Sequence, residues 1–379
     1  MKASIETTKT FQEEYEKIKA KIPECRAYKA LEAVKPLLNE RPLVLYGAGS
    51  LGKRICGICE ELGIKVSFFC DHNEEGTCND VQIIRPETLR EKLSNAVVVI
   101  CSWTYNDEIN STLQGLLGFP NEQIIPCPSE FASWNSPQGF NIHLNGYEWA
   151  YNFFNDDLSR QLVLDRISLI LLDKGLKVNT KSDCYYEDEF IKLGNHEIFV
   201  DGGAFTGDSV ISFINTVSKS DVMFHIYSFE PDKGNYELAL NNLRGYPNVT
   251  IEQKGLWSSE KILTFSEHTT NTLNSSFVNQ GGTKTYFVPV TSLDAYFKGK
   301  SDNELPSLIK MDIEGAEKEA LLGSAEIIKR RKPKLAICAY HKPEDIYELP
   351  RIILNIRNDY RFCLRQHEKG QYDTVLYAV

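Results

Sequence analysis

The sequence lacks any apolar run of the roughly 18 residues that a membrane-spanning helix requires. Its first residues, Met1 to Glu6, also lack the apolar region of a secretory signal. Positive charge is scarce, because 42 Lys and Arg residues stand against 52 Asp and Glu residues and the net charge is −10. We therefore expect a cytoplasmic protein that neither inserts into a membrane nor binds nucleic acid.

Metal-binding cysteine patterns are also missing, although the chain has ten cysteines. Several lie inside apolar runs, such as Cys338, which is typical of buried free thiols in a reducing compartment. Cys56 and Cys59 form one Cys-x-x-Cys pair with no second pair, so we expect them to pack a helix rather than bind zinc.

Apolar runs alternate with helical patterns along most of the 379 residues, which predicts two domains built on parallel sheets. The last two runs, 360–365 and 373–378, predict an antiparallel hairpin. The predicted fold class is α/β, with two doubly wound Rossmann-like domains, the second of which suits a class I methyltransferase sheet. The predicted parts are a helical N-terminal segment at 1–40, a Rossmann-like nucleotide-binding-type domain at 41–130, a linker and bridging helix at 131–195, and the second domain at 196–379.

Several helices are predicted from the spacing of apolar residues. The segment 8–40 is expected to be helical with a break at Pro23. Single helices are expected at about 147–175 and at 315–331, and 286–290 is a strand candidate.

The most informative motif follows the apolar run 198–200. There, two glycines and a third, Gly207, come between Asp201 and Asp208, where a helix is expected to begin. Glycines after a strand let the backbone approach a ligand closely. The two carboxylates would repel a pyrophosphate and attract a ligand with an amine and a sulfonium, which favours S-adenosylmethionine (SAM) over a dinucleotide.

Two later strand ends add candidates for the same cofactor. Glu230, followed by Pro231, ends the next expected strand, where an acidic side chain accepts hydrogen bonds from ribose hydroxyls. Leu256 or Trp257 could cover an adenine, although Trp257 is equally consistent with the core. The predicted cofactor-binding residues are Asp201, Gly202, Gly203, Ala204, Phe205, Thr206, Gly207, Asp208, Glu230, Pro231, Leu256 and Trp257.

Candidate catalytic residues come after the two following strands. Asp312 ends the run 307–312, with Glu314 beside it, and His341 ends the run 334–340. His341 is expected to be the general base for a hydroxyl, with Asp312 as the other candidate. Glu317 either complements the dipole of the next helix or joins the site. We predict no resident metal ion, the alternative being a divalent ion held by Asp312, Glu314 and His341.

Residues 147–379 resemble an FkbM-family SAM-dependent methyltransferase, and that resemblance implies a class I fold and methyl transfer to oxygen, often on a sugar or polyketide hydroxyl. It implies SAM contacts at Asp201, Gly203, Gly207 and Glu230, and it places Asp312, Glu314 and His341 at the active-site edge. One departure is Arg365-Gln366-His367, where related sequences tend to have a His or aromatic residue directly after the Arg. The matching stretches are 199–204, 207–208, 228–231, 292–294, 308–317, 332–337, 340–345 and 374–378.

The first domain carries its own G-x-G-x-x-G motif at a strand-to-helix turn, followed by Lys53 and Arg54, which would reinforce anion binding. Three interpretations stay open: a nucleotide-sugar site, a structural or oligomerisation role, and an NAD-dependent oxidoreductase. No Tyr-x-x-x-Lys motif supports the last of these. The candidate residues of this second nucleotide site are Gly47, Gly49, Ser50, Leu51, Gly52 and Asp71.

Together these patterns predict a SAM-dependent O-methyltransferase that acts on the hydroxyl of a small molecule or glycan, in glycan or secondary-metabolite biosynthesis. The stretch 268–277 is rich in hydroxyl and amide side chains, which suits either recognition of a polyol or a solvated loop. The sequence leaves open whether the chain forms a homo-oligomer.

Overall fold

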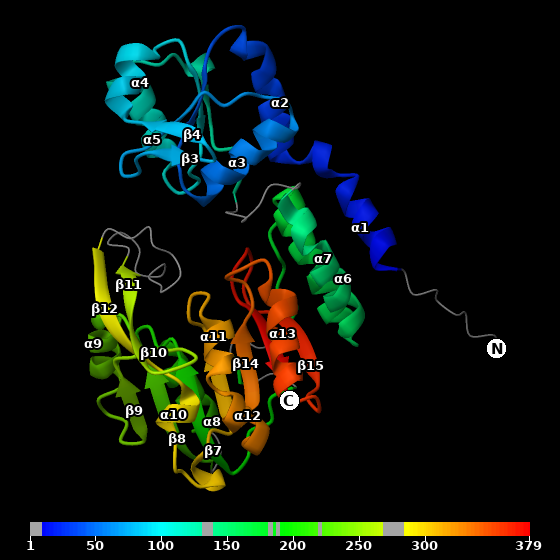
Figure 1. Cartoon of the computed structure of the whole chain (residues 1–379), viewed down its shortest axis with the longest axis vertical. Helices are drawn as coiled ribbons and strands as arrows, with labels where there is room; N and C mark the ends of the chain where they lie inside the picture. The colour runs from blue at the N-terminus through cyan, green and yellow to red at the C-terminus, as the bar shows by residue number, and fades with distance from the viewer. Residues whose placement is uncertain (1–9, 131–138, 181–184, 187–189, 219–221, 268–283) are drawn as a thin grey trace, which may run out of the picture. The chain divides into compact units, whose positions relative to one another are not determined.

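A computed structural model describes residues 10–130, 139–180, 185–186, 190–218, 222–267 and 284–379 (Figure 1). The chain forms two compact units. The first, unit 1, comprises residues 1–152 and 163–176, and the second, unit 2, comprises 153–162 and 177–379. Helix α7 (Asp157–Leu172) therefore contributes its first residues to unit 2 and the rest to unit 1. No helix in the described ranges has the length and apolar character needed to cross a bilayer.

Unit 1 contains a six-stranded sheet in the order β3-β4-β2-β1-β5-β6. Its neighbouring strands are parallel, except for the antiparallel pair β3 and β4. All four residues of β1 and of β5 are buried, as expected for a parallel sheet covered on both faces. The predicted doubly wound sheet is confirmed. Its strands are β1 (Leu43–Tyr46), β2 (Phe68–Cys70), β3 (Thr77–Cys78), β4 (Val81–Ile84), β5 (Val97–Ile100) and β6 (Ile124–Ile125).

The helical start of unit 1 breaks where the sequence predicts. Helix α1 begins after Thr10, whose side chain accepts a hydrogen bond from the Glu13 amide. Pro23 lies in a short 3₁₀ segment, because it cannot donate a backbone hydrogen bond inside a longer helix. The helices of this unit are α1 (Phe11–Lys19), α2 (Arg26–Leu38), α3 (Ser50–Glu61), α4 (Pro86–Lys92), α5 (Asn106–Ser111) and α6 (Leu144–Phe153).

Unit 2 contains a seven-stranded sheet in the order β15-β16-β14-β13-β7-β8-β9. In Figure 1 the green strands β7 and β8 and the orange strand β14 belong to this sheet, and β13 pairs with β7 in parallel register. The predicted hairpin is confirmed, but its second strand, β16, inserts between β14 and β15 and is antiparallel to both. The strands are β7 (His196–Gly202), β8 (Met223–Phe229), β9 (Val249–Glu252), β13 (Leu308–Met311), β14 (Lys334–Cys338), β15 (Phe362–Gln366) and β16 (Thr374–Ala378).

The predicted strand at 286–290 belongs to a separate three-stranded sheet, in the order β10-β12-β11. Strand β12 (Lys284–Thr291) pairs with β11 (Lys261–Glu267) in antiparallel register, and with the short β10 (Gly255–Leu256) in parallel register. Alternating apolar residues indicate a strand without identifying its partner, so the sequence did not separate this sheet from the larger one.

The predicted helix at 315–331 is divided at Gly323. A Cβ at Gly323 would lie 2.1 Å from the carbonyl oxygen of Trp257, so only glycine permits this close approach. The helices of unit 2 are α8 (Asp208–Val217), α9 (Lys233–Asn242), α10 (Leu293–Tyr296), α11 (Glu317–Leu322), α12 (Ala325–Arg331) and α13 (Asp345–Ile356).

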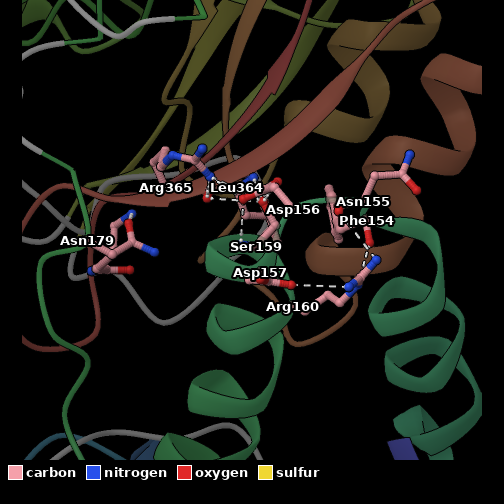
Figure 2. Close-up of polar contacts among 10 residues, drawn as sticks. Phe154, Asn155, Asp156, Asp157, Ser159, Arg160, Asn179, Leu364 and Arg365 are labelled. Atoms are coloured by element: carbon pink, nitrogen blue, oxygen red, sulfur yellow. Dashed lines mark hydrogen bonds and ion pairs between the residues drawn. The ribbon is translucent and has the colours of Figure 1, made fainter. Parts of the chain in front are cut away.

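The predicted helix at 147–175 is also two helices, because a new N-terminus begins after Asp156 (Figure 2). Asp156 accepts a hydrogen bond from the Ser159 amide at 3.0 Å. It also forms an ion pair with Arg365 at 3.0 Å. The Leu364 amide of β15 donates to the Ser159 hydroxyl at 2.8 Å. Arg365 is buried in this contact, which holds the start of α7 against β15.

Candidate active site

The glycine loop of unit 2 runs from Gly203 to Gly207, between the ends of β7 and α8. Gly203 has a φ of +79°, and a Cβ there would lie 1.8 Å from the carbonyl oxygen of Asp312. The amides of Gly203 and Ala204 both donate to the carbonyl of Phe229, at 3.0 and 3.1 Å. The loop is thereby held between the carboxyl ends of β8 and β13, the edge at which open α/β sheets bind ligands.

Asp201 does not face this edge as a free charge. It is fully buried, and its carboxylate accepts hydrogen bonds from the hydroxyls of Ser209 and Ser228, at 2.9 and 2.8 Å. Lys310 lies 3.1 Å away in an ion pair, and its ammonium also donates to the carbonyl of Gly203 at 2.9 Å. Burial lowers the pKa of Lys310, but Asp201 and Asp312 together raise it above its ordinary value.

The ion pair with Lys310 indicates a structural role for Asp201. Its charge is matched inside the protein, so the expected direct attraction of a sulfonium by Asp201 is not supported by the structure. Asp201 and Lys310 instead fix the backbone of the glycine loop. Asp208 is exposed at the start of α8, where it complements the helix dipole.

Glu230 lies at the end of β8 and is almost fully buried. Its two carboxylate oxygens accept hydrogen bonds from the amides of Phe205, at 2.8 Å, and Asp232, at 2.9 Å. Burial raises the pKa of Glu230 to about 7, against the lowering effect of these two amides. The structure therefore brings Glu230 directly to the glycine loop.

Most of the remaining cofactor candidates lie at or next to the glycine loop, and Trp257 lies against β11. A Cβ at Gly202 would lie 2.8 Å from the Leu256 side chain, so Leu256 packs against the loop. Phe205 and Thr206 are partly exposed in the loop, and Pro231 is partly exposed next to Glu230. The Trp257 ring lies 5.1 Å from the ammonium of Lys261, which places it against β11.

The three catalytic candidates lie together. His341 Nε2 is 3.4 Å from Asp312 Oδ1 and 3.7 Å from Glu314 Oε2. His341 is buried, while the side chains of Asp312 and Glu314 are 24% and 38% exposed, so the carboxylates face the accessible side of the cluster. Glu314 has a φ of +54°, a left-handed conformation that is unusual for a non-glycine residue and common at functional sites.

Two further residues complete the cluster. Glu317 is fully buried, and its Oε1 lies 3.1 Å from His341 Nδ1. Tyr340, which the sequence reasoning missed, donates its hydroxyl to Asp312 Oδ1 at 2.9 Å. Tyr340 could have been considered because it immediately precedes His341, but only the fold shows that its hydroxyl reaches another strand end.

The carboxylates determine the charge of His341. Burial lowers its pKa, but Glu317, Asp312 and Glu314 together raise it to about 10. His341 is therefore an imidazolium at neutral pH, which does not suit the role of general base that the sequence suggested. Partial burial near Asp312 and Glu317 raises the pKa of Glu314 to about 7, opposed by His341.

The glycine motif of unit 1 forms a similar turn. Gly47 has a φ of +117°, and a Cβ at Gly52 would lie 2.0 Å from the Gly47 carbonyl oxygen. Asp71 accepts a hydrogen bond from the Ala48 amide at 2.8 Å. Gly49 and Ser50 are exposed, whereas Leu51 is buried.

Two expectations about unit 1 side chains have different outcomes. Arg54 is buried, so it does not reinforce an anion site as expected, and only Lys53 is exposed there. Cys56 and Cys59 are buried on α3, and burial raises their pKa values to about 11 and 12. Protonated, buried thiols agree with a packing role. The nine cysteines within the described ranges are all free.

Comparison with known proteins identifies the domain that holds this cluster. Residues 201–362 match the family described as the methyltransferase FkbM domain. This part of unit 2 is similar to an FkbM methyltransferase domain. Glu230, Asp312, Glu314 and His341 all lie within the matched residues. The family and the class I sheet together support methyltransferase activity for this chain.

One solved structure supports the fold of this chain. The crystal structure of a methyltransferase FkbM from Methylobacillus flagellatus KT has a TM-score of 0.60 at 21% identity, and the match covers 97% of this chain and 98% of that chain. An rRNA methylase from Streptococcus thermophilus has a TM-score of 0.31 at 16% identity, covering 49% and 87% of the two chains. Its low score adds nothing to the assignment. A comparison with curated proteins finds no match.

Proposed function

We propose that the protein is a SAM-dependent O-methyltransferase whose acceptor is the hydroxyl of a small molecule, most directly a sugar. The observation that carries this proposal is the position of Glu230. Its buried carboxylate lies against the amide of Phe205 in the glycine loop of an FkbM domain. A carboxylate there can accept both ribose hydroxyls of the adenosine, while Gly203 lets the cofactor approach the backbone. The sugar acceptor is supported by the family resemblance, because the polar stretch 268–277 lies outside the described residues.

The proposed reaction is a direct displacement. The acceptor oxygen attacks the methyl carbon of SAM, the bond between sulfur and methyl breaks, and an O–CH₃ bond forms, leaving S-adenosylhomocysteine and one proton. Glu314 is the proposed acceptor of that proton, because its side chain is more exposed than those of Asp312 and His341. Its Oε2 lies 3.7 Å from His341 Nε2, which is beyond hydrogen-bond distance. Asp312 and His341 position the acceptor, and alignment of the reacting atoms supplies much of the acceleration.

Calorimetric titration of the full chain with SAM, NAD and a nucleotide-sugar tests the cofactor. We expect SAM to bind in the micromolar range and to yield methylated product with a sugar acceptor. Binding of NAD without SAM would overturn the proposal. A screen of free sugars, nucleotide-sugars and glycans for methyl incorporation then identifies the acceptor.

A second candidate function is the binding of a nucleotide-sugar by unit 1. The observation in its favour is the contact between Asp71 and the Ala48 amide at the first glycine turn. The same titration tests it, because a nucleotide-sugar bound by unit 1 would still bind to a variant with Glu230→Gln.

A further inference from the structure

The cluster at the ends of β13 and β14 contains a set of atoms with the chemistry of a metal site. Asp312, Glu317 and His341 each offer one ligand atom, and these atoms all lie within 4.8 Å of one another. The three side chains come from different places in the fold. Asp312 follows β13, His341 follows β14, and Glu317 is the first residue of α11.

A second observation concerns Glu317. Its side chain is completely buried, and its Oε2 has no hydrogen-bond partner among the residues that the structure describes. Neither ring nitrogen of buried His341 makes a well-directed hydrogen bond there. Buried polar atoms are nearly always paired, so a carboxylate oxygen left without a partner indicates that something binds to it.

The charges around Glu317 also favour a bound cation. Glu317, Asp312, Glu314 and Asp345 are acidic, and the cations that face members of this group are His341 and, at Asp345, Lys342. Lys310 is committed to Asp201 and the glycine loop. Because burial of unbalanced negative charge is unfavourable, a divalent cation would neutralise the excess.

The ligand atoms are held by supporting hydrogen bonds. The Tyr340 hydroxyl donates to Asp312 Oδ1 at 2.9 Å, and the Ile313 amide donates to Glu317 Oε1 at 2.9 Å. Such outer contacts orient the ligands of metal sites.

We propose that Asp312, Glu317 and His341 bind one divalent cation, which replaces the proton on the His341 imidazolium and polarises the acceptor hydroxyl. This inference rests on the proposed methyl transfer. An imidazole with two carboxylates suits Mn²⁺ or Zn²⁺ better than Ca²⁺, which prefers oxygen ligands alone. Three protein ligands leave coordination positions open for the acceptor oxygen, whose proton then leaves more readily to Glu314.

Metal binding is measured directly on the full chain after treatment with EDTA. Titration with Mn²⁺, followed by electron paramagnetic resonance of the free ion, and competition of Zn²⁺ with a chelating dye should each give one site per chain. Glu317→Gln keeps the shape of the side chain and is expected to weaken binding at least about tenfold. The matched control is Glu326→Gln, which removes an exposed carboxylate on α12 and should leave binding unchanged.

The inference is overturned if neither ion binds, or if Glu317→Gln and Glu326→Gln bind equally well. Thermal unfolding shows whether Glu317→Gln is folded, and Asp312→Asn replaces it if it is not. SAM titration in EDTA separates this inference from the proposed function, because we expect SAM to bind without metal. If SAM binds but neither metal ion does, the metal-site inference is wrong and the proposed function stands. If a metal ion binds but SAM does not, the proposed function is wrong.

Discussion

The two units contain nearly the same glycine turn but surround it with different side chains. In unit 1 the carboxylate of Asp71 accepts from the Ala48 amide at 2.8 Å and from the amide two residues further along, that of Asn73, also at 2.8 Å. In unit 2, Glu230 accepts from Phe205 at 2.8 Å and again from the amide two residues further along. Both carboxylates follow the second strand of a doubly wound sheet.

The difference lies at the neighbouring strand end. A Cβ at Gly47 would lie 3.0 Å from the Cys101 carbonyl oxygen, and a Cβ at Gly203 would lie 1.8 Å from that of Asp312. Cys101 is a buried thiol whose pKa is raised by burial, whereas Asp312 belongs to a cluster with His341. A common turn thus occurs in both units, but unit 2 has Asp312, near His341, at the neighbouring strand end where unit 1 has Cys101.

The largest expected effect is that of Gly203→Ala compared with Gly47→Ala. The new Cβ at position 203 would overlap the backbone of Asp312, so we expect a loss of about 4 kcal/mol in stability and no measurable SAM binding. Gly47→Ala should cost only about 1–2 kcal/mol and leave SAM binding intact. Thermal unfolding and calorimetry measure both. Equal effects would contradict the comparison.

If methyl transfer takes place in unit 2, Glu314→Gln should strongly reduce turnover. Loss of the proton acceptor should lower kcat by about 10²–10³-fold while the Kd for SAM changes little. The matched control is Cys101→Ser, at the equivalent strand end of unit 1, which should keep kcat within about twofold of the original protein. A normal kcat for Glu314→Gln would exclude Glu314 as the base.

The two carboxylates at the second strand ends give an intermediate effect. Glu230→Gln should weaken SAM binding by roughly 10–100-fold, because hydrogen bonds to a charged group contribute about 1.5–3 kcal/mol. Asp71→Asn should leave the Kd for SAM unchanged. A reversed result would assign SAM to unit 1.

The smallest expected effect is a pH dependence of SAM affinity. Burial raises the pKa of Glu230 to about 7, so the ionised form that accepts ribose hydroxyls is lost below that pH. SAM should therefore bind about tenfold more tightly at pH 8 than at pH 6. The stability of the protein without ligand should change with pH in the opposite direction. The folded state holds the proton of Glu230 up to a higher pH than the unfolded chain does, so protonated Glu230 stabilises the fold at low pH. This stabilisation is lost as pH rises from about 4.5 to 7. Glu230→Gln should remove this part of the pH dependence of the Kd.

Much of the fold was predictable because strands of parallel sheets are short, apolar and separated by helices. The hairpin 360–378 and the glycine turns were recognised in this way, and the family match at 201–362 agrees with the resemblance seen in the motifs. The break in the helix at Gly323 was not recognised, because it depends on the carbonyl of Trp257, which is distant in the sequence.

The sequence alone determined which residues lie at the carboxyl ends of the strands, since the order of strands and turns follows from local pattern. Glu230, Asp312 and His341 were found on that basis. Only the tertiary structure decided their charges. Lys310 neutralises Asp201, and three carboxylates keep His341 protonated, because Coulomb interactions depend on distance in space and on burial.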